Sequence, residues 1–157
     1  MQLQGKIALV TGGGRGIGRG IVDCFLEEGA QVAVVQRQAL DTALQNHPQV
    51  AHIHADLSIP SSITAAVEGV VERFGGIDIL VNNAGIMFER GVSRLLVEEW
   101  DLMVAVNMRA PLFLAQAALP HMRERGGGSV INIAPSKGSG RTPTMRPIAR
   151  PKRVFMA

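Results

Sequence analysis

Short apolar runs alternate with stretches of helical periodicity along most of the chain. The apolar runs have the length and composition of buried strands, and five of them stand out: Ile7–Val10, Val32–Val35, Ala51–Ala55, Ile77–Val81 and Val130–Ile133. Between these runs, apolar residues recur every three or four positions, which predicts helices before Gly29, over Leu40–Gln45, from Pro60 to Gly75, over Leu95–Val106 and over Leu112–Met122.

This alternation predicts one fold class. Strands joined through helices form right-handed crossovers, and therefore a parallel sheet with helices on both faces. We expect a doubly wound α/β domain, Rossmann-like, with three layers α/β/α and strand order 3-2-1-4-5. Residues 1–140 would form this domain. The periodicity stops after Ala134, so residues 141–157 are expected to be a basic, proline-rich irregular tail and the fold to be incomplete at its C-terminal side.

A glycine-rich segment follows the first strand and carries the strongest chemical signal. Residues Thr11–Gly18 read T-G-G-G-R-G-I-G and join a buried strand to an amphipathic helix. Glycines allow a tight turn and let backbone N–H groups approach a pyrophosphate, whose charge the helix N-terminus favours. The spacing differs from G-x-G-x-x-G, and no Lys-Ser/Thr pair follows to make a P-loop. Because a flexible linker would not stand between these two elements, the pattern favours a dinucleotide site.

Several motifs together resemble those of one family. T-G-x-x-x-G-x-G is similar to the cofactor fingerprint of the short-chain dehydrogenases/reductases, and Asn82–Gly85 resembles their N-N-A-G motif. Asp56-Leu57 after the third strand, and Trp100 with Asn107, resemble further landmarks. The motifs keep the family's order and spacing up to about residue 140. The resemblance implies an oxidoreductase that transfers a hydride between a nicotinamide dinucleotide and an alcohol or ketone.

The resemblance also implies roles for individual residues. Asp56 would lie beside the adenine ring, and the small residues at 83–85 would leave room for a ribose of the cofactor. Asn107 would bend its helix and hold a water in a proton relay, although a solvated surface position is the alternative. The expected cofactor-binding residues are Gly12, Gly14, Arg15, Gly16, Ile17, Gly18, Arg37, Asp56, Leu57, Asn83, Ala84 and Gly85.

The end of the second strand bears on the choice of cofactor. In a Rossmann unit an acidic residue there binds the ribose 2′-hydroxyl and selects NAD. Gln36 holds that place, Arg37 follows it, and no carboxylate comes before Asp41. An arginine can pair with a 2′-phosphate, and Arg15 in the glycine turn could reach the same group. We therefore expect NADP to be preferred over NAD.

The residues that would complete the family's chemistry are missing. The family uses a tyrosine as proton donor, a lysine four residues later and a serine, whereas this chain contains no tyrosine. Pro135 stands where the serine is expected and Ser136 lies one residue later, which leaves Asn107 and, doubtfully, Ser136 as catalytic residues. The 157-residue chain is therefore expected to be inactive. The alternative to an oxidoreductase is a non-catalytic dinucleotide-binding or regulatory pseudoenzyme.

Three explanations for the last residues stay open: a natural pseudoenzyme, a domain fragment, or a shift of reading frame. One permitted back-translation of residues 141–157, read from its third base, contains Y-x-x-x-K at the family's spacing from the fifth strand. Under the frameshift hypothesis the tail has no evolved partner. Its five basic residues, with no acid, account for the positive formal charge of +3.

The composition of the chain indicates what kind of protein it is and which partners to expect. Hydrophobic residues make up 46% of the chain, which is typical of a globular protein. No apolar run has the length of a membrane span, so we expect no membrane partner. We also expect no signal peptide and no nucleic-acid partner. Four histidines form no metal-binding pattern, so no metal is expected.

The single cysteine and the resemblance complete these expectations. Cys24 cannot form an internal disulfide, and its helical context predicts a buried, reduced thiol and a cytoplasmic protein. The resemblance implies a nicotinamide dinucleotide and a small alcohol or carbonyl substrate as partners. It also implies that intact relatives form homo-oligomers.

Overall fold

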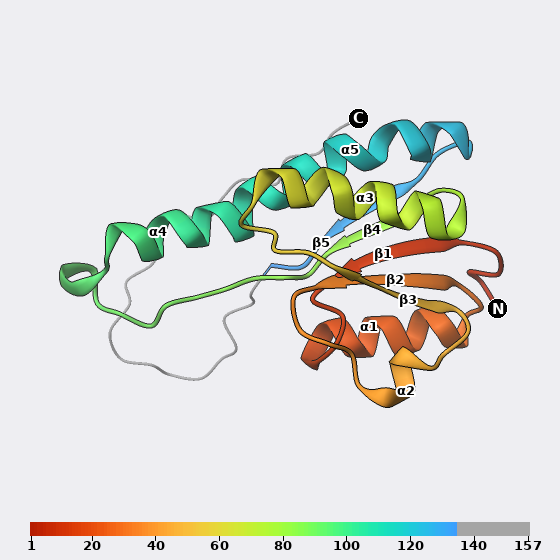
Figure 1. Ribbon diagram of the computed structural model, residues 1–157, viewed down its shortest axis with the longest axis horizontal. Coiled ribbons are helices and arrows are strands. Elements are labelled where there is room, and N and C mark those ends of the chain that lie inside the picture. The colour runs from red at the N-terminus through yellow and green to blue at the C-terminus, as the bar shows by residue number, and fades with distance from the viewer. Residues whose placement is uncertain (135–157) are drawn as a thin grey trace.

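The computed structural model describes residues 1–134, in which five parallel strands form one sheet. Its order is β3-β2-β1-β4-β5, as predicted (Figure 1). The strands are β1 (Ile7–Thr11), β2 (Gln31–Gln36), β3 (Val50–His54), β4 (Ile79–Asn82) and β5 (Ser129–Asn132). The predictions for Pro135, Ser136 and the tail concern positions outside the described residues.

Helices cover both faces of the sheet, which confirms the three-layer arrangement. Helices α1 (Gly16–Glu27) and α2 (Thr42–Gln45) lie on one face, and α3 (Pro60–Phe74) and α5 (Ala110–Glu124) lie on the other (Figure 1). Strand β1 is buried along its whole length. Its alternate side chains enter two separate cores, Ala8 on the α1 side and Leu9 on the α3 side. This two-sided burial explains why the strand is continuously apolar in sequence.

The two helices predicted after the fourth strand are one continuous helix, so that prediction was wrong. Helix α4 (Val97–Val104) runs through a π-helical segment, η2 (Ala105–Arg109), directly into α5; a short 3₁₀ turn, η1 (Val92–Arg94), precedes it. In the π segment the N–H of Ala110 donates to the carbonyl of Ala105, one residue further back than in an α-helix. The extra residue shifts the apolar periodicity, and therefore the sequence shows two separate patterns.

From the sequence we expected no segment with the length of a membrane span, but the joined helix has that length. By length and composition alone, Val97–Glu124 is long and apolar enough to cross a membrane. However, its α5 half buries one face in the core through Ala110, Leu114, Ala118 and Met122. Such burial is typical of a core helix in a globular domain.

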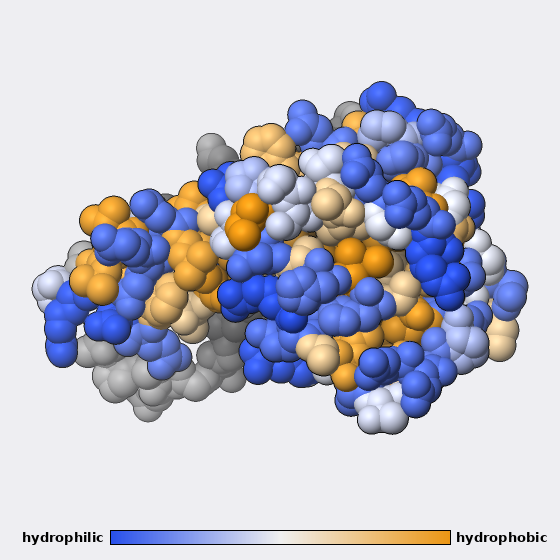
Figure 2. Space-filling view, in the orientation of Figure 1, coloured by the Kyte–Doolittle hydropathy of each residue, from blue (hydrophilic) through white to orange (hydrophobic). Residues whose placement is uncertain are grey.

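Helix α4 differs from α5 because it extends beyond the sheet and buries no residue (Figure 1). Figure 2 shows apolar surface among polar residues at this end of the molecule. Among the large hydrophobic side chains of α4, Val97 is 70% exposed and Trp100 is 55% exposed.

The environment of Cys24 corrects another expectation. Its side chain lies on the exposed face of α1, whereas the buried face is formed by Gly18 and Val22. Two residues along a helix turn the side-chain direction by about 200°. The apolar residues beside Cys24 in the sequence therefore predicted its burial wrongly.

A buried carboxylate ties the amino edge of the sheet together. Asp78, only 4% exposed, accepts a hydrogen bond from the Ile7 backbone N–H at 2.8 Å. It also forms ion pairs with Arg125 at 2.9 Å and Lys6 at 3.5 Å. Burial alone would raise the pKa of Asp78, but the Arg125 hydrogen bond, the Ile7 N–H and the two cations outweigh it and lower the pKa. The ionised carboxylate thus holds β1, β4 and the end of α5 together.

We predict that Asp78→Asn destabilises the fold in a pH-dependent way. A carboxyl with a lowered pKa contributes stability that is present above about pH 4 and is lost as the pH falls through the folded-state value. At pH 7 the substitution should reduce the free energy of unfolding in urea by about 1–3 kcal/mol. Near pH 3 the difference from the wild type should shrink. Glu68→Gln on exposed α3 surface is the control, and an equal effect of Asp78→Asn at both pH values would contradict the assignment.

Candidate functional site

The candidate site lies at the carboxyl edge of the sheet, where β1 and its neighbour β4 both end. The Thr11 hydroxyl accepts hydrogen bonds from the backbone N–H groups of Asn83, at 3.0 Å, and Ala84, at 2.9 Å. In return the Asn83 amide donates to the carbonyls of Thr11, at 2.9 Å, and Gly12, at 3.1 Å. Hydrogen bonds in both directions thus join the glycine turn to the N-N-A-G segment. Thr11 was not among the expected binding residues, although it opens the motif.

The glycine turn has the backbone geometry that its composition predicts. Gly12 and Gly16 have φ values of 65° and 57°, in the region where glycine carries no steric cost. A Cβ at Gly18 would overlap the Gly12 carbonyl and the Asn83 amide. Helix α1 then begins at Gly16 without a side-chain cap, and Ile17 beside it is 69% exposed. An uncapped helix N-terminus behind an open glycine turn can bind an anionic group through its backbone N–H groups.

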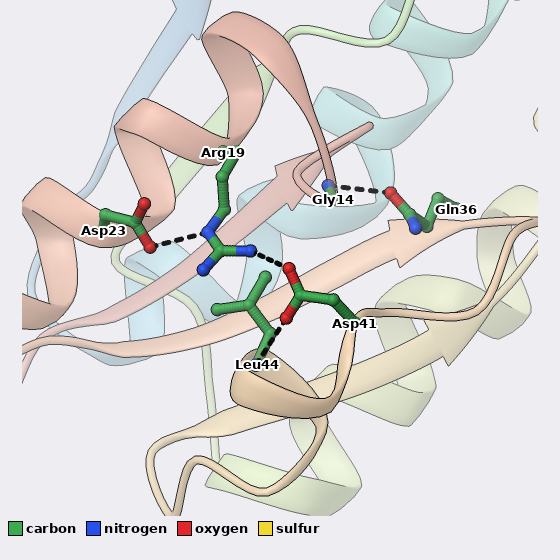
Figure 3. A network of polar contacts seen from close by, with 6 residues as sticks. All are labelled: Gly14, Arg19, Asp23, Gln36, Asp41 and Leu44. Carbon is green, nitrogen blue, oxygen red and sulfur yellow. Dashed lines mark hydrogen bonds and ion pairs between the residues drawn. The ribbon is translucent and has the colours of Figure 1, made fainter.

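Gln36 connects the glycine turn to the end of β2. Its side-chain oxygen accepts a hydrogen bond from the Gly14 N–H at 2.8 Å (Figure 3). Its amide nitrogen donates to the Gln38 carbonyl at 2.8 Å. The side chain is thereby folded back onto the turn. The position where Rossmann proteins that select NAD carry an acid is uncharged here and is occupied by an internal bridge.

Arg37 and Asp56 meet at the ends of β2 and β3. A guanidinium nitrogen of Arg37 lies 3.4 Å from one oxygen of Asp56, and the Arg37 side chain is 60% exposed. The other oxygen of Asp56 accepts from the hydroxyl and backbone N–H of Ser58, at 2.7 and 2.9 Å. These Ser58 hydrogen bonds, together with the charge of Arg37, lower the pKa of Asp56 although burial opposes them. Leu57, by contrast, buries its side chain in the α3 core.

Asn107 lies in the π-helical segment and holds the chain that follows N-N-A-G. Its side-chain oxygen accepts from the Ile86 N–H at 2.9 Å, and its nitrogen donates to the Ile86 carbonyl at 2.7 Å. The side chain is therefore partnered even though the residue is exposed. The expected helix distortion is present as the π turn. Pro111, four residues later, has no N–H to donate to the Asn107 carbonyl, as a residue there would in an α-helix.

The same π segment contains a residue that the sequence analysis did not single out. Arg109 donates a hydrogen bond to the Ser58 carbonyl, and its Nε is buried with no partner among residues 1–134. Arg109 thus links the π segment to the turn that carries Asp56. No three histidine, cysteine or acidic side chains gather as a metal-binding group in the part of the chain described.

The sequence matches the family model of the short chain dehydrogenases over residues 6–147. It is 33% identical to an uncharacterized oxidoreductase of Thermotoga maritima, over 99% of this chain and 63% of that protein. It is 37% identical to an uncharacterized oxidoreductase of Staphylococcus aureus, over 87% of this chain and 61% of that protein. The chain therefore spans less than two thirds of the length of these relatives.

The chain is also similar to solved structures of short-chain dehydrogenases/reductases. A metagenomic short-chain oxidoreductase in complex with NADP has a TM-score of 0.80 and 33% identity, covering 90% of this chain and 67% of that one. A short-chain dehydrogenase/reductase of Serratia marcescens has a TM-score of 0.79 and 38% identity, covering 92% and 60%.

The Asn107 contacts predict local protection of one backbone amide. In Asn107→Leu, both hydrogen bonds to Ile86 are lost, so the Ile86 amide should exchange its hydrogen about 5- to 13-fold faster, as expected for the loss of about 1–1.5 kcal/mol of local stability. Asn107→Asp keeps the acceptor oxygen and should retain most of the protection. The measurement is amide exchange followed by NMR, with core amides of β1 as the internal reference. Unchanged exchange at Ile86 in the leucine variant would show that this contact does not hold the segment.

Proposed function

The chain belongs to the short-chain dehydrogenase family, and on this premise we propose that its carboxyl sheet edge binds a nicotinamide dinucleotide, NADP in preference to NAD. The proposal rests on the fit between the carboxyl edge of the sheet and the pyrophosphate of such a dinucleotide. Gly16 opens onto free space where a pyrophosphate would approach, and α1 offers uncapped N–H groups behind it.

The residues around this edge suggest how the parts of the cofactor would be held. We place the pyrophosphate at Gly14–Gly18, and one ribose beside the small residues Ala84 and Gly85. Asp56 would accept from the adenine amino group. When bound, the nicotinamide supplies or accepts the hydride, and an alcohol or ketone is the proposed substrate class. Asn107 would keep the segment after Gly85 in place beside the reacting end.

The preference for NADP rests on charge at the end of β2. Gln36 contributes no negative charge there, and its bridge to Gly14 occupies the carboxamide oxygen. Arg37 is exposed and faces a single carboxylate through a long contact of 3.4 Å. A 2′-phosphate would offer Arg37 a second, more highly charged partner, and exposed Arg15 lies on the neighbouring turn.

The 157-residue polypeptide itself is proposed to bind cofactor without turnover. Reduction of a carbonyl needs a proton donor at the developing alkoxide, and well-placed general acid catalysis contributes roughly 10²–10⁴-fold in rate. The sequence contains no tyrosine to provide it. This absence favours, for this polypeptide, the second candidate function of a non-catalytic dinucleotide-binding protein within an oxidoreductase family.

We predict that the chain binds NADPH more tightly than NADH in calorimetric titrations. Arg37→Ala should weaken NADPH binding about tenfold, because a charge-assisted hydrogen bond contributes roughly 1.5–3 kcal/mol when partly buried and less at an exposed site. The same substitution should change NADH binding little. Equal or tighter binding of NADH by the unmodified chain would contradict the NADP assignment. So would NADPH binding that survives Arg37→Ala unchanged.

We further predict no measurable turnover across a panel of alcohols and ketones. The coding DNA around codons 134–141 tests the frameshift origin of the tail. If a single restored base opens a frame containing Y-x-x-x-K, the longer product should turn over substrate, with Pro135→Ser as a second change where needed. Robust NADP-dependent turnover by the unmodified chain would refute the inactivity proposal. A closed downstream frame would remove only the frameshift hypothesis.

A further inference from the structure

Arg19 and two carboxylates form a charged cluster beside the proposed 2′-phosphate subsite. The Arg19 Nε lies 2.7 Å from an oxygen of Asp23 one turn along α1, and its terminal nitrogen contacts Asp41 (Figure 3). Both hydrogen bonds raise the pKa of Arg19, and a guanidinium is charged at physiological pH even without them. Only 27% of the Arg19 side chain is exposed.

Asp41 joins this cluster to the loop that follows β2. One of its oxygens accepts from the Leu44 N–H at 2.9 Å and caps α2, and the other faces Arg19. The Leu44 hydrogen bond and Arg19 lower the pKa of Asp41, which keeps it ionised. Asp41 is the first acid after Gln36 and stands four residues beyond Arg37. Four residues can span at most about 14 Å, so its charge lies close to the end of β2.

Two bridges therefore connect the same two segments of chain. Gly14 and Gln36 join the glycine turn to the end of β2, and Arg19 and Asp41 join the start of α1 to the loop beyond it (Figure 3). The first bridge is uncharged. In the second, Arg19 lies between Asp41 and Asp23, so its single positive charge offsets the carboxylate of Asp41 while it also pairs with Asp23 on α1.

We propose that Arg19 determines cofactor specificity without touching the cofactor, because it neutralises Asp41 and keeps the loop after β2 receptive to a 2′-phosphate. This inference rests on the proposed NADP preference and extends it to a residue outside the expected binding set. The other charged groups at this corner are Asp23, which shares Arg19 with Asp41, together with Arg15, Arg37 and Asp56, of which the last two balance each other. Without Arg19, Asp41 would oppose the phosphate directly.

The size of the effect follows from charge and distance. A phosphate monoester carries about −1.5 to −2 charges at pH 7, and a carboxylate about 10 Å away repels it by an amount that corresponds to roughly 3- to 10-fold in affinity at low ionic strength. Salt screens such a repulsion, because the Debye length falls from about 10 Å at 0.1 M to about 3 Å at 1 M. A purely structural role of Arg19 would show neither this size nor this salt dependence.

The test uses two probes that differ only in the 2′-phosphate, adenosine 2′,5′-bisphosphate and adenosine 5′-monophosphate. Their affinities for the full chain are measured by calorimetry at low and high salt. In Arg19→Met, the preference for the bisphosphate should fall about 3- to 10-fold at low salt and much less at high salt, while monophosphate binding changes little. Arg19→Lys should retain the preference.

A second substitution separates charge from structure. Asp41→Asn removes the carboxylate but keeps a good N-cap for α2, so Arg19→Met with Asp41→Asn should recover most of the lost preference. Arg123→Met is the matched control, because this exposed arginine lies in the last turn of α5, whose end adjoins the opposite, amino edge of the sheet. It changes net charge equally and should leave the ratio unchanged.

The outcomes distinguish this inference from its premise. If the unmodified chain prefers the bisphosphate but Arg19→Met weakens both probes equally, or the double variant recovers nothing, Arg19 is structural and the inference is wrong. If the unmodified chain binds both probes equally, the NADP preference is wrong and the inference falls with it. If it binds neither probe, nor NADPH, the proposed cofactor site itself is overturned.

Discussion

Close backbone contact between the glycine turn and the N-N-A-G segment is the constraint on which the rest of the site depends. A side chain at Gly18 would occupy the space of the Gly12 carbonyl and the Asn83 amide, so the two strand ends could not approach. Because they do approach, Asn83 can bind the carbonyls of Thr11 and Gly12, and the Thr11 hydroxyl can bind the opposite backbone. The start of α1 then faces the carboxyl edge with its N–H groups free of any side-chain cap.

Two further contacts extend this constraint along the sheet edge. On the β2 side, Gln36 fixes the glycine turn through Gly14. On the other side, Asn107 fixes Ile86 after the N-N-A-G segment. The loops that would meet a dinucleotide are therefore held by hydrogen bonds within the chain, which reduces the conformational entropy that binding would have to overcome.

Features that depend on local pattern were predictable from sequence, and features that depend on packing across the fold were not. Strand order and layers followed from the alternation of buried strands and helices, and the meeting of the glycine turn with Asn83 followed from the parallel topology. The separation of α4 from α5 was wrong, because one extra residue in a π turn imitates a break in periodicity. The exposure of Cys24 and the burial of Leu57 depend on which side each element turns toward the core. The Arg19–Asp41 pair joins positions 22 residues apart and has no signature in sequence.

The central claim is that the carboxyl edge of this sheet is a dinucleotide site, and an NMR titration of the labelled full chain with NADP tests it most directly. The account predicts saturable shifts of backbone amides at residues 12–18, 36–37, 56–57 and 83–86, with smaller changes at the amino edge around Asp78. Perturbations that centre elsewhere, for example on the surface depression lined by His52 and Arg73, would contradict it, as would no saturable shift at all.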